Sequence, residues 1–210
     1  DRPVLVVLSL DDEEGTAERS DRLHGGEAAE GGVAPRLAPR PEDGLRLRAV
    51  VPPEALRAML FAATRAPSGS NRQPFRFLVL TDGPKAQEAK RLIAEAGQKI
   101  WSGKREHDGY DQGSGAVDDS PKARMARTMQ HYVDHFASAP VLVLPCLVRY
   151  REPTPFEGAS IFPACQNLLL AARALGYGGV LTGFHGMVEP ELRTLLGPVL
   201  LFIVLQALGA

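Results

Sequence analysis

The stretch from Arg65 to Phe77 constrains the fold of this chain more than any other. It reads Arg-Ala-Pro-Ser-Gly-Ser-Asn-Arg-Gln-Pro-Phe-Arg-Phe and joins an apolar helical segment to an apolar strand-like segment. Pro67 and Pro74 fix φ and remove two backbone donors, so the connection is stiff, and Gly69 permits a turn or a close backbone approach to a ligand. The hydroxyl and amide side chains both donate and accept hydrogen bonds. This mixture suits the edge of a planar heterocycle, although the same residues also form ordinary turns.

The segments on either side have the periodicities of a helix and a strand. Pro52 and Pro53 precede Glu54, which predicts a helix with proline in its first turn. Apolar residues then recur at helical spacing at Leu56, Met59, Leu60 and Ala63. The segments after the stretch are a predicted strand at Phe75–Leu80, a second helix at Lys85–Ile100, and an exposed loop at 101–120 around Trp101 and Tyr110, which in a binding protein would be a lid.

The second half of the chain continues this alternation. Val141–Val148 is almost entirely apolar, which is typical of a strand covered on both faces. The connections vary too much in length for a regular doubly wound sheet, so the pattern predicts an α+β sandwich. The other predicted elements are a third helix lined by Met125, Met129, Tyr132, Val133 and Phe136, a long helix at Gly158–Leu175, a short apolar segment at Val180–Phe184, a helix at Glu189–Leu196 and a strand at Val199–Leu208.

Residues 1–48 lack the patterns of the rest. Val4–Leu10 has the composition of a strand. The residues that follow, up to about Asp43, are acidic, Gly-rich and Pro-rich without apolar periodicity, and we expect much of this part to be mobile. No nucleotide-binding glycine pattern follows Val4–Leu10, which argues against a dinucleotide-binding fold there. The prediction is a poorly assigned segment at 1–48 and one domain at 49–210.

Charge and cysteine content limit the class of protein. Lys plus Arg number 24 and Asp plus Glu 25 in 210 residues, and this near balance gives no general attraction to nucleic acid or to anionic membranes. The longest apolar runs are too short to span a bilayer, and the N-terminus lacks the order of a signal peptide. Cys146 and Cys165, the two cysteines, lie in apolar segments and favour a reducing compartment. We therefore expect a cytoplasmic protein that binds neither nucleic acid nor membrane.

Several common sites are disfavoured by the residues present. His131 and His135 have the spacing of a metal pair on a helix, but Tyr132 stands where a zinc protease has its glutamate, and no further ligands cluster nearby. Neither cysteine has the polar surroundings of an activated nucleophile. The chain contains no nucleophile-elbow and no Walker A sequence.

The order of residues in the first stretch carries a family resemblance. Ala-Pro-Ser-Gly-x-Asn-x-Gln-Pro-(aromatic)-x-Phe resembles the N-terminal signature of the nitroreductase family, the FMN-dependent NAD(P)H oxidoreductases. The segment Phe162–Gly179 resembles the long central helix that this family buries at its dimer interface, and it follows at the family's usual position. The resemblance covers about Val51–Gly209. It implies a three-layer sandwich with a mainly antiparallel central sheet flanked by helices, and a homodimer with two FMN sites at its interface.

The resemblance also assigns the cofactor site. In the family, a backbone amide near Thr182 and Gly183 points at the flavin N5, where a fixed donor stabilises developing charge. An extended segment would place Arg46 and Arg48 on one face, where they would hold the FMN phosphate or remain solvated surface charges. His185 lies directly after this turn and is interpreted as having no role in the site. The residues expected at FMN are Arg46, Arg48, Pro67, Ser68, Gly69, Asn71, Gln73, Val180, Leu181, Thr182 and Gly183.

The activity implied by the resemblance is ping-pong electron transfer from NAD(P)H, as co-substrate, to nitroaromatic, quinone or similar electron-poor substrates. The flavin carries the chemistry, so no catalytic side chain and no metal is expected. Two alternatives remain. Relatives of the same fold include flavin-dependent dehalogenases and flavin-fragmenting enzymes, and the chain would also suit a non-catalytic dimeric binding protein that has lost flavin.

Overall fold

The computed structural model describes residues 6–7, 51–148, 152, 154 and 156–197. Arg46, Arg48, the predicted strand Val199–Leu208 and most of the segment 1–48 lie outside these residues. The regular elements are β1 (Val6–Val7), α1 (Pro53–Thr64), β2 (Phe75–Leu80), α2 (Pro84–His107), α3 (Pro121–His135), β3 (Val141–Leu147), α4 (Phe162–Ala174) and α5 (Glu189–Leu196), with short 3-10 turns η1 (Gly69–Asn71), η2 (Gly113–Ala116), η3 (Phe136–Ser138), η4 (Glu157–Ser160) and η5 (Phe184–Met187).

The described strands form one sheet in the order β1-β3-β2. β2 and β3 are antiparallel, with Phe75 opposite Leu147 and Leu80 opposite Leu142, while β1 pairs with β3 in parallel at Val6 and Val141. Every residue of β3 is buried, because both faces of this central strand are covered. The small, mainly antiparallel sheet among helices confirms the predicted α+β class.

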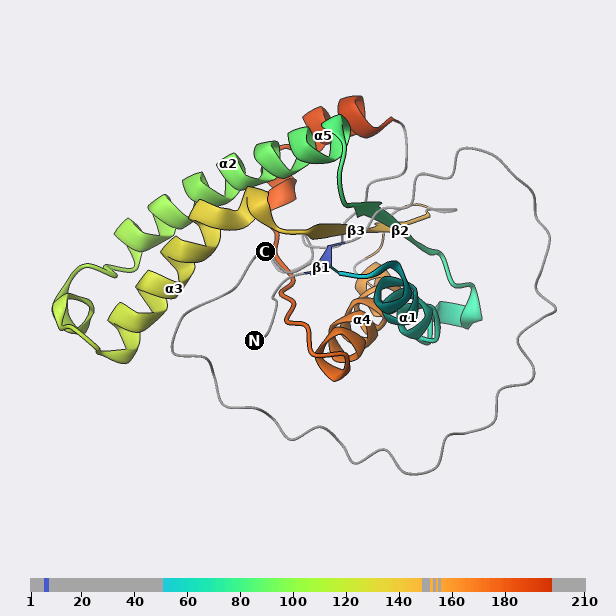
Figure 1. Ribbon diagram of the computed structural model, residues 1–210, viewed down its shortest axis with the longest axis horizontal. Coiled ribbons are helices and arrows are strands. Elements are labelled where there is room, and N and C mark those ends of the chain that lie inside the picture. The colour runs from blue at the N-terminus through green and yellow to red at the C-terminus, as the bar shows by residue number, and fades with distance from the viewer. Residues whose placement is uncertain (1–5, 8–50, 149–151, 153, 155, 198–210) are drawn as a thin grey trace.

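The helices form a layer on each face of the sheet. Figure 1 shows α1 and α4 together on one side of the strands, and α2, α3 and α5 on the other. α2 and α3 pack against each other and extend past the sheet as an arm, which we call the α2–α3 arm. The buried side chains of both layers and of β2 and β3 belong to one apolar core.

Proline marks the start of every α-helix in the described part of the chain. Each of α1 to α5 has proline at its first or second position. Proline suits this position because its fixed φ is already helical and its missing N–H has no partner within the helix. The prediction from Pro52 and Pro53 for α1 is thus confirmed, and the same local chemistry sets the other four starts.

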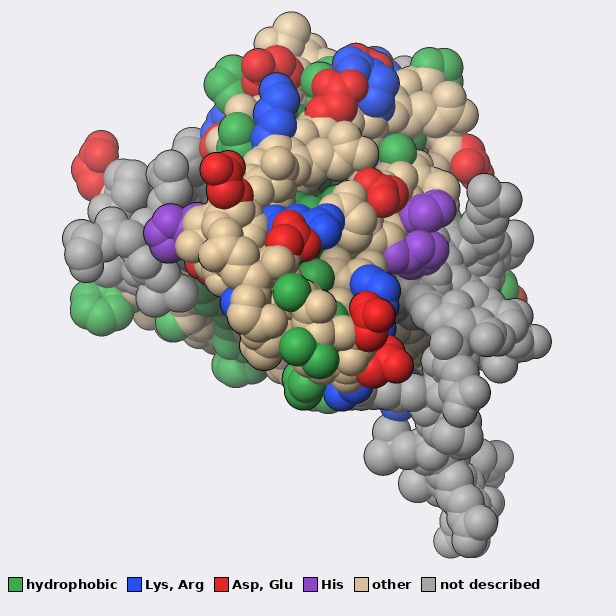
Figure 2. Space-filling view, turned by 90° about the vertical axis from the view of Figure 1, so that its left-hand side faces the viewer, with side chains coloured by type: hydrophobic (Ala, Val, Ile, Leu, Met, Phe, Trp, Pro, Cys, Tyr) green, Lys and Arg blue, Asp and Glu red, His purple; other side chains and the backbone are tan. Residues whose placement is uncertain are grey.

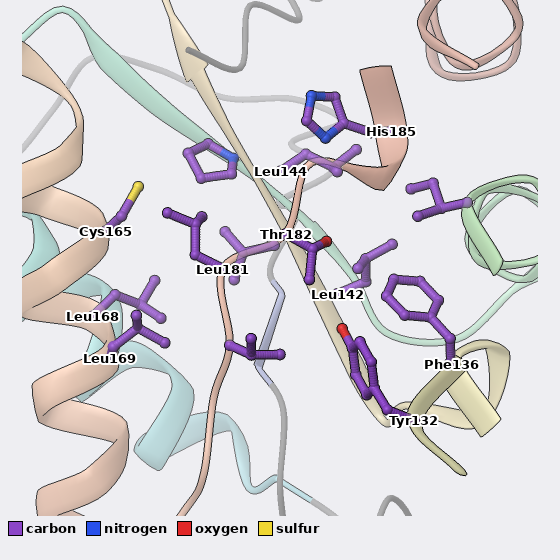
Figure 3. Close-up of a pocket in the computed structure, with 14 residues that line it drawn as sticks. Tyr132, Phe136, Leu142, Leu144, Cys165, Leu168, Leu169, Leu181, Thr182 and His185 are labelled. Atoms are coloured by element: carbon purple, nitrogen blue, oxygen red, sulfur yellow. The ribbon is translucent and has the colours of Figure 1, made fainter. Parts of the chain in front are cut away.

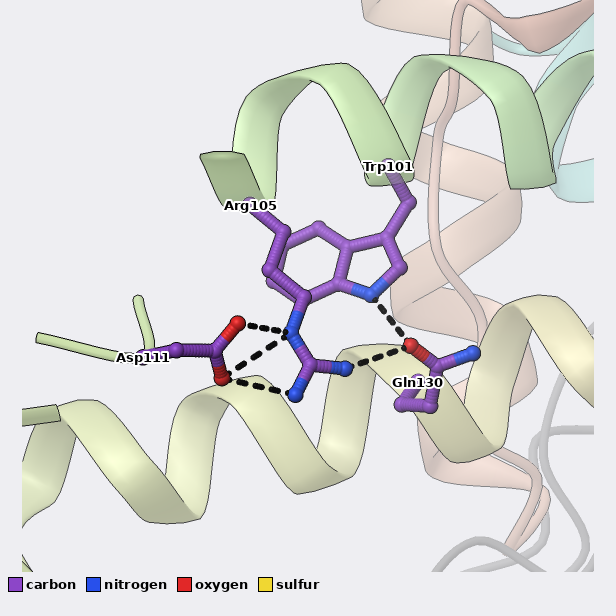
Figure 4. A network of polar contacts seen from close by, with 4 residues as sticks. All are labelled: Trp101, Arg105, Asp111 and Gln130. Atoms are coloured by element: carbon purple, nitrogen blue, oxygen red, sulfur yellow. Dashed lines mark hydrogen bonds and ion pairs between the residues drawn. The ribbon is translucent and has the colours of Figure 1, made fainter. Parts of the chain in front are cut away.

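The second helix is longer than predicted. α2 runs to His107 rather than Ile100, and Trp101 is buried instead of lying in an exposed loop. The indole N–H of Trp101 donates to Gln130 Oε1 of α3 (3.0 Å), and Arg105 Nη1 donates to the same oxygen (2.9 Å). Arg105 also pairs with Asp111, as Figure 4 shows. α3 thus covers this part of α2, a contact that the local sequence does not reveal.

Two smaller predictions also need correction. Met125 does not line the buried face of the third helix, because its side chain is 47% exposed. The predicted helix Gly158–Leu175 divides into the turn η4 and the helix α4, which begins only at Phe162, next to Pro163. Proline at the second position accounts for this start, since it cannot supply the N–H that a longer helix would need there.

A buried lysine ties the arm to the sheet. Lys90 of α2 is 5% exposed, and its ammonium donates to the carbonyl oxygens of Thr81 (2.5 Å) and Pro140 (3.3 Å), which lie directly after β2 and directly before β3. Burial lowers the pKa of Lys90, and the charge of Asp82 opposes that shift. The ammonium group therefore donates hydrogen bonds to two carbonyl oxygens that lie just outside the paired residues of β2 and β3.

The surface at the end of the arm has mixed charge. Figure 2 views the molecule from this side and shows basic and acidic side chains interspersed. Ion pairs on the arm include Lys104 with Asp108 and Arg127 with Asp119. Among the described residues, no helix combines the length and apolar character needed to cross a bilayer.

Gly97 on α2 gives a direct test of how closely the layers pack. A Cβ at this position would lie 2.6 Å from Cδ2 of Phe184, whose ring packs in one cluster with those of Tyr132 and Phe136. Gly97→Ala should therefore lower the free energy of unfolding by about 1–3 kcal/mol. Gly103→Ala, on the same helix, meets nothing within 4 Å and should raise it by about 0.5–1 kcal/mol. Urea unfolding measures both, and effects of the same sign would contradict this packing.

Candidate functional site

The loop between α1 and β2 has an uncommon backbone. Ser70, Asn71 and Gln73 have φ of 55°, 51° and 47°, in the left-handed region that side chains other than glycine seldom adopt. Such residues persist only where the surrounding structure holds them, and they are concentrated at functional sites. The predicted stiff connection is therefore present, with its strain at Ser70, Asn71 and Gln73 rather than at Gly69.

Hydrogen bonds hold this loop in place. The Ser68 hydroxyl accepts from the backbone N–H of Gln73 (2.8 Å), and the Ser68 carbonyl accepts from the N–H of Asn71 (2.9 Å). The N–H of Gly69 donates to Ser160 Oγ, just before α4 (3.1 Å). Gly69 thus makes the close approach that its sequence position suggested, but to Ser160 of this same chain. Within the described residues, no hydrogen bond engages the side-chain amides of Asn71 and Gln73, which are exposed to solvent.

The second predicted segment lies along the side of α4. A Cβ on Gly179 would lie 2.6 Å from Leu169 Cδ2, so the chain passes close to the end of this side chain where it turns back onto the helix. Val180 and Leu181 are each 41% exposed, and Thr182 is half-buried. The turn η5 then places Phe184 in the core against α2. The predicted residues Val180–Gly183 thus form a partly exposed, irregular segment.

A cavity of about 50 Å³ lies between this segment, α3, α4 and the middle of β3. Most of its wall is apolar, and Figure 3 shows Tyr132, Phe136 and Thr182 on one side and Cys165, Leu168 and Leu169 on the other. Three of the predicted cofactor residues, Val180, Leu181 and Thr182, line it, whereas Pro67–Gln73 do not.

Two titratable groups of this cavity are uncharged at neutral pH. Burial lowers the pKa of His185 from 6.5 to about 4, and the charge of Glu189 opposes that shift. Burial raises the pKa of Tyr132 above its ordinary value, and the Thr182 hydroxyl opposes this rise. The two hydroxyls nevertheless lack hydrogen-bonding geometry, so the Tyr132 oxygen has no partner among the described residues.

The cysteines are buried thiols. Burial raises the pKa of Cys146 and of Cys165 to about 11, in each case opposed by weaker polar contacts. A thiol with a raised pKa carries little thiolate at neutral pH and is a poor nucleophile. This agrees with the sequence-based interpretation that neither is an activated cysteine.

The two predicted halves of the site occupy different places along α4. The Gly69 loop contacts Ser160, before the helix begins, whereas Gly179 packs on Leu169 in its second half. At 1.5 Å per residue, these positions are roughly 14 Å apart along the helix. The two segments therefore contact the α4 region at separate positions.

Sequence reasoning did not assign Tyr132 and His185 to a cavity. Tyr132 was expected only as one of the apolar positions of a helix, and His185 was interpreted as incidental, yet it is 7% exposed. The available signal was its place directly after Phe184, at the end of the apolar segment Val180–Phe184. A histidine that follows such a segment is more often buried than one in a polar loop.

The sequence of this chain resembles those of one known protein family. The model of the nitroreductase family matches residues 47–203, about three quarters of the chain. A search of curated proteins found no match.

Solved structures with a similar fold include a nitroreductase with bound FMN from Bacteroides fragilis, at 23% identity over 72% of this chain and 71% of that chain, with a TM-score of 0.48. A BluB-like flavoprotein from Clostridium difficile 630 has 24% identity over 70% and 72%, with a TM-score of 0.46. An FMN and NADPH-dependent nitroreductase from Sphigopyxis sp. strain HMH has 23% identity over 73% and 78%, with a TM-score of 0.47.

Proposed function

The chain belongs to the nitroreductase family, and from this premise we propose that it is an FMN-dependent oxidoreductase. In this proposal it transfers electrons from NAD(P)H to small electron-poor acceptors such as nitroaromatics or quinones, with ping-pong kinetics. FMN supplies the electron-carrying chemistry, and the protein supplies binding, orientation and electrostatics.

The observation that carries the proposal is the loop from Ser68 to Gln73. Its backbone is held by internal hydrogen bonds in a strained conformation, while the amides of Asn71 and Gln73 remain exposed and uncommitted within the described part of the chain. An amide both donates and accepts, which matches a flavin ring edge that carries carbonyl oxygens and N–H groups. The donor set therefore fits FMN, with Ser68, Asn71 and Gln73 as the binding side chains, beside Pro67 and Gly69, which shape the loop.

The segment Val180–Gly183 would contribute the other wall of the FMN site. Its irregular backbone is partly exposed, so its N–H groups are accessible to a ligand, and we assign Thr182 and Gly183 to the flavin N5 region. Arg46 and Arg48, outside the described residues, are the proposed phosphate ligands.

A homodimer would unite the two halves of the site. One chain places the Gly69 loop and the Gly179 turn at separate positions on α4. Large apolar side chains are also exposed on the same layer, with Phe61 of α1 at 56% and Leu170 of α4 at 58%. Exposed apolar side chains grouped on one surface are typical of an interface. We propose that a second copy covers this layer and completes two FMN sites.

The visible absorption spectrum of the purified protein, before and after adding FMN and removing the excess, tests the cofactor assignment. The expected result is a protein-bound flavin band that is bleached by NADH or NADPH under nitrogen and restored by a quinone. Light scattering on the same sample should give the mass of a dimer. A protein that holds no flavin under either condition would overturn the proposal.

A double variant tests the loop residues. Asn71→Ala combined with Gln73→Ala should weaken FMN binding by about tenfold or more, because each lost hydrogen bond contributes about 0.5–1.5 kcal/mol. Gln98→Ala, which removes an exposed amide from α2, is the matched control and should leave FMN affinity unchanged. Fluorescence titration with FMN measures all three proteins. An unchanged affinity in the double variant would remove this loop from the cofactor site.

A further inference from the structure

The cavity beside α3 has no role in the proposed FMN site, although Val180, Leu181 and Thr182 border both. It is enclosed by residues of a single chain, from α3, β3, α4 and the segment up to His185, and it opens toward Val180 and Leu181. Its volume of about 50 Å³ exceeds the roughly 10–15 Å³ that a single water molecule needs. This space admits a small molecule or the end of one.

The Tyr132 hydroxyl is the feature of this cavity that points to a ligand. Tyr132 is 4% exposed, lines the cavity, and its oxygen has no hydrogen-bond partner in the described part of the protein. Figure 3 shows this oxygen directed toward Thr182 across the open space. Buried hydroxyls are nearly always paired with protein, water or ligand. The Tyr132 hydroxyl is therefore an unpaired polar group in a mostly apolar wall, to which Thr182 and His185 add two further polar side chains.

The charge of the wall limits which molecule can enter. Lys, Arg, Asp and Glu are absent from the described residues that line the cavity, and His185 is neutral in its buried position. An ionised ligand would lose its hydration without gaining a partner of opposite charge. Tyr132 and Phe136 add two aromatic rings, which favour contact with a flat apolar molecule.

We propose that this cavity binds a small, neutral, mostly apolar molecule with a single hydroxyl or carbonyl oxygen, and that this oxygen pairs with the hydroxyl of Tyr132. The apolar part of the molecule lies between Phe136 and Leu168 and extends past Val180 and Leu181.

Two probes of nearly equal shape test this assignment. p-Cresol carries the required hydroxyl, and p-xylene has a methyl group in its place. Titration of the purified protein, followed by NMR of leucine and valine methyl groups, should show both ligands shifting Leu168 and Val143. p-Cresol should bind roughly three- to tenfold more tightly, which is the effect of one hydrogen bond.

Substitutions decide whether Tyr132 makes that bond. Tyr132→Phe keeps the ring but removes the hydroxyl, so it should bind p-cresol and p-xylene with about equal affinity. Tyr110→Phe, which removes a hydroxyl on the α2–α3 arm, is the matched control and should leave the preference unchanged. Thr182→Val should also preserve most of it, since Thr182 has no hydrogen bond with Tyr132. Absence of methyl shifts with both probes, or a preference that persists in Tyr132→Phe, would overturn the proposal.

Discussion

Phe136→Ala should lower the free energy of unfolding by about 3–5 kcal/mol, the usual cost of removing a buried phenyl ring. Phe136 is 1% exposed, and its ring centroid lies 5.7 Å from that of Tyr132 and 5.9 Å from that of Phe184. It lies where α3 ends and the chain enters β3, so its loss opens a cavity where the arm meets the sheet. Guanidinium unfolding followed by circular dichroism measures the change.

The matched control for this substitution is Phe156→Ala. Phe156 is 79% exposed, and a substitution on the surface should change stability by no more than about 0.5 kcal/mol. Similar losses at the two positions would contradict the packing described here. Because the same ring lines the cavity, Phe136→Ala should also enlarge that space.

His185 should make the protein less stable in mild acid. Its pKa is about 4 in the folded protein and about 6.5 in an unfolded chain. Between these values the unfolded chain binds the proton and the folded protein does not, so stability is complete above about pH 6.5 and declines as the pH falls toward 4. Over the interval from pH 7.5 to pH 5 the expected loss through His185 is about 2 kcal/mol.

The variant His185→Gln isolates this contribution. It removes the titrating group, so its stability relative to the native protein should improve by about 2 kcal/mol between pH 7.5 and pH 5. Leu192→Ala, at another buried position but without a titrating group, should lose stability by the same amount at both pH values. Urea unfolding at the two pH values provides the measurement. If the free energies of unfolding of the native protein and of His185→Gln changed in parallel with pH, the prediction would be wrong. His185 would then accept a proton as readily in the folded state as in the unfolded chain.

The elements with strong local patterns were predicted from the sequence. β2 and α5 have the predicted bounds, Phe75–Leu80 and Glu189–Leu196, because a short apolar run and a short amphipathic run are each bounded by turn residues or proline. The central strand was recognised by its unbroken apolar sequence, which buried faces on both sides require.

The extent of α2 could not be predicted, because it depends on residues far along the chain. From Trp101 onward the sequence contains glycine and many charges, which locally indicate a loop. The helix continues because Gln130 of α3 accepts hydrogen bonds from Trp101 and Arg105, and because Asp111 folds back onto Arg105. Gln130 lies 25 positions from Arg105 and 29 from Trp101, so a window of local periodicity does not contain its contacts.

The geometry of the predicted site segments did not follow from the sequence, and their assignment to a cofactor stays a prediction. The loop motif and the turn motif are each present, yet the left-handed backbone falls on Ser70, Asn71 and Gln73, and Gly69 serves a contact with Ser160. Tyr132 and His185 become notable only through burial, which arises from the packing of α3 and η5 against the sheet. Sequence spacing alone gives no measure of that burial.

The strained loop also bears on how quickly a ligand would be captured. Its conformation is already fixed by the Ser68 and Ser160 contacts, so the entropy of ordering it is lost when the chain folds and not when a ligand arrives. Recognition at a surface of this kind approaches rigid docking, in which encounter and orientation set the association rate. Differences in affinity between related ligands would then appear chiefly in how long each one stays bound.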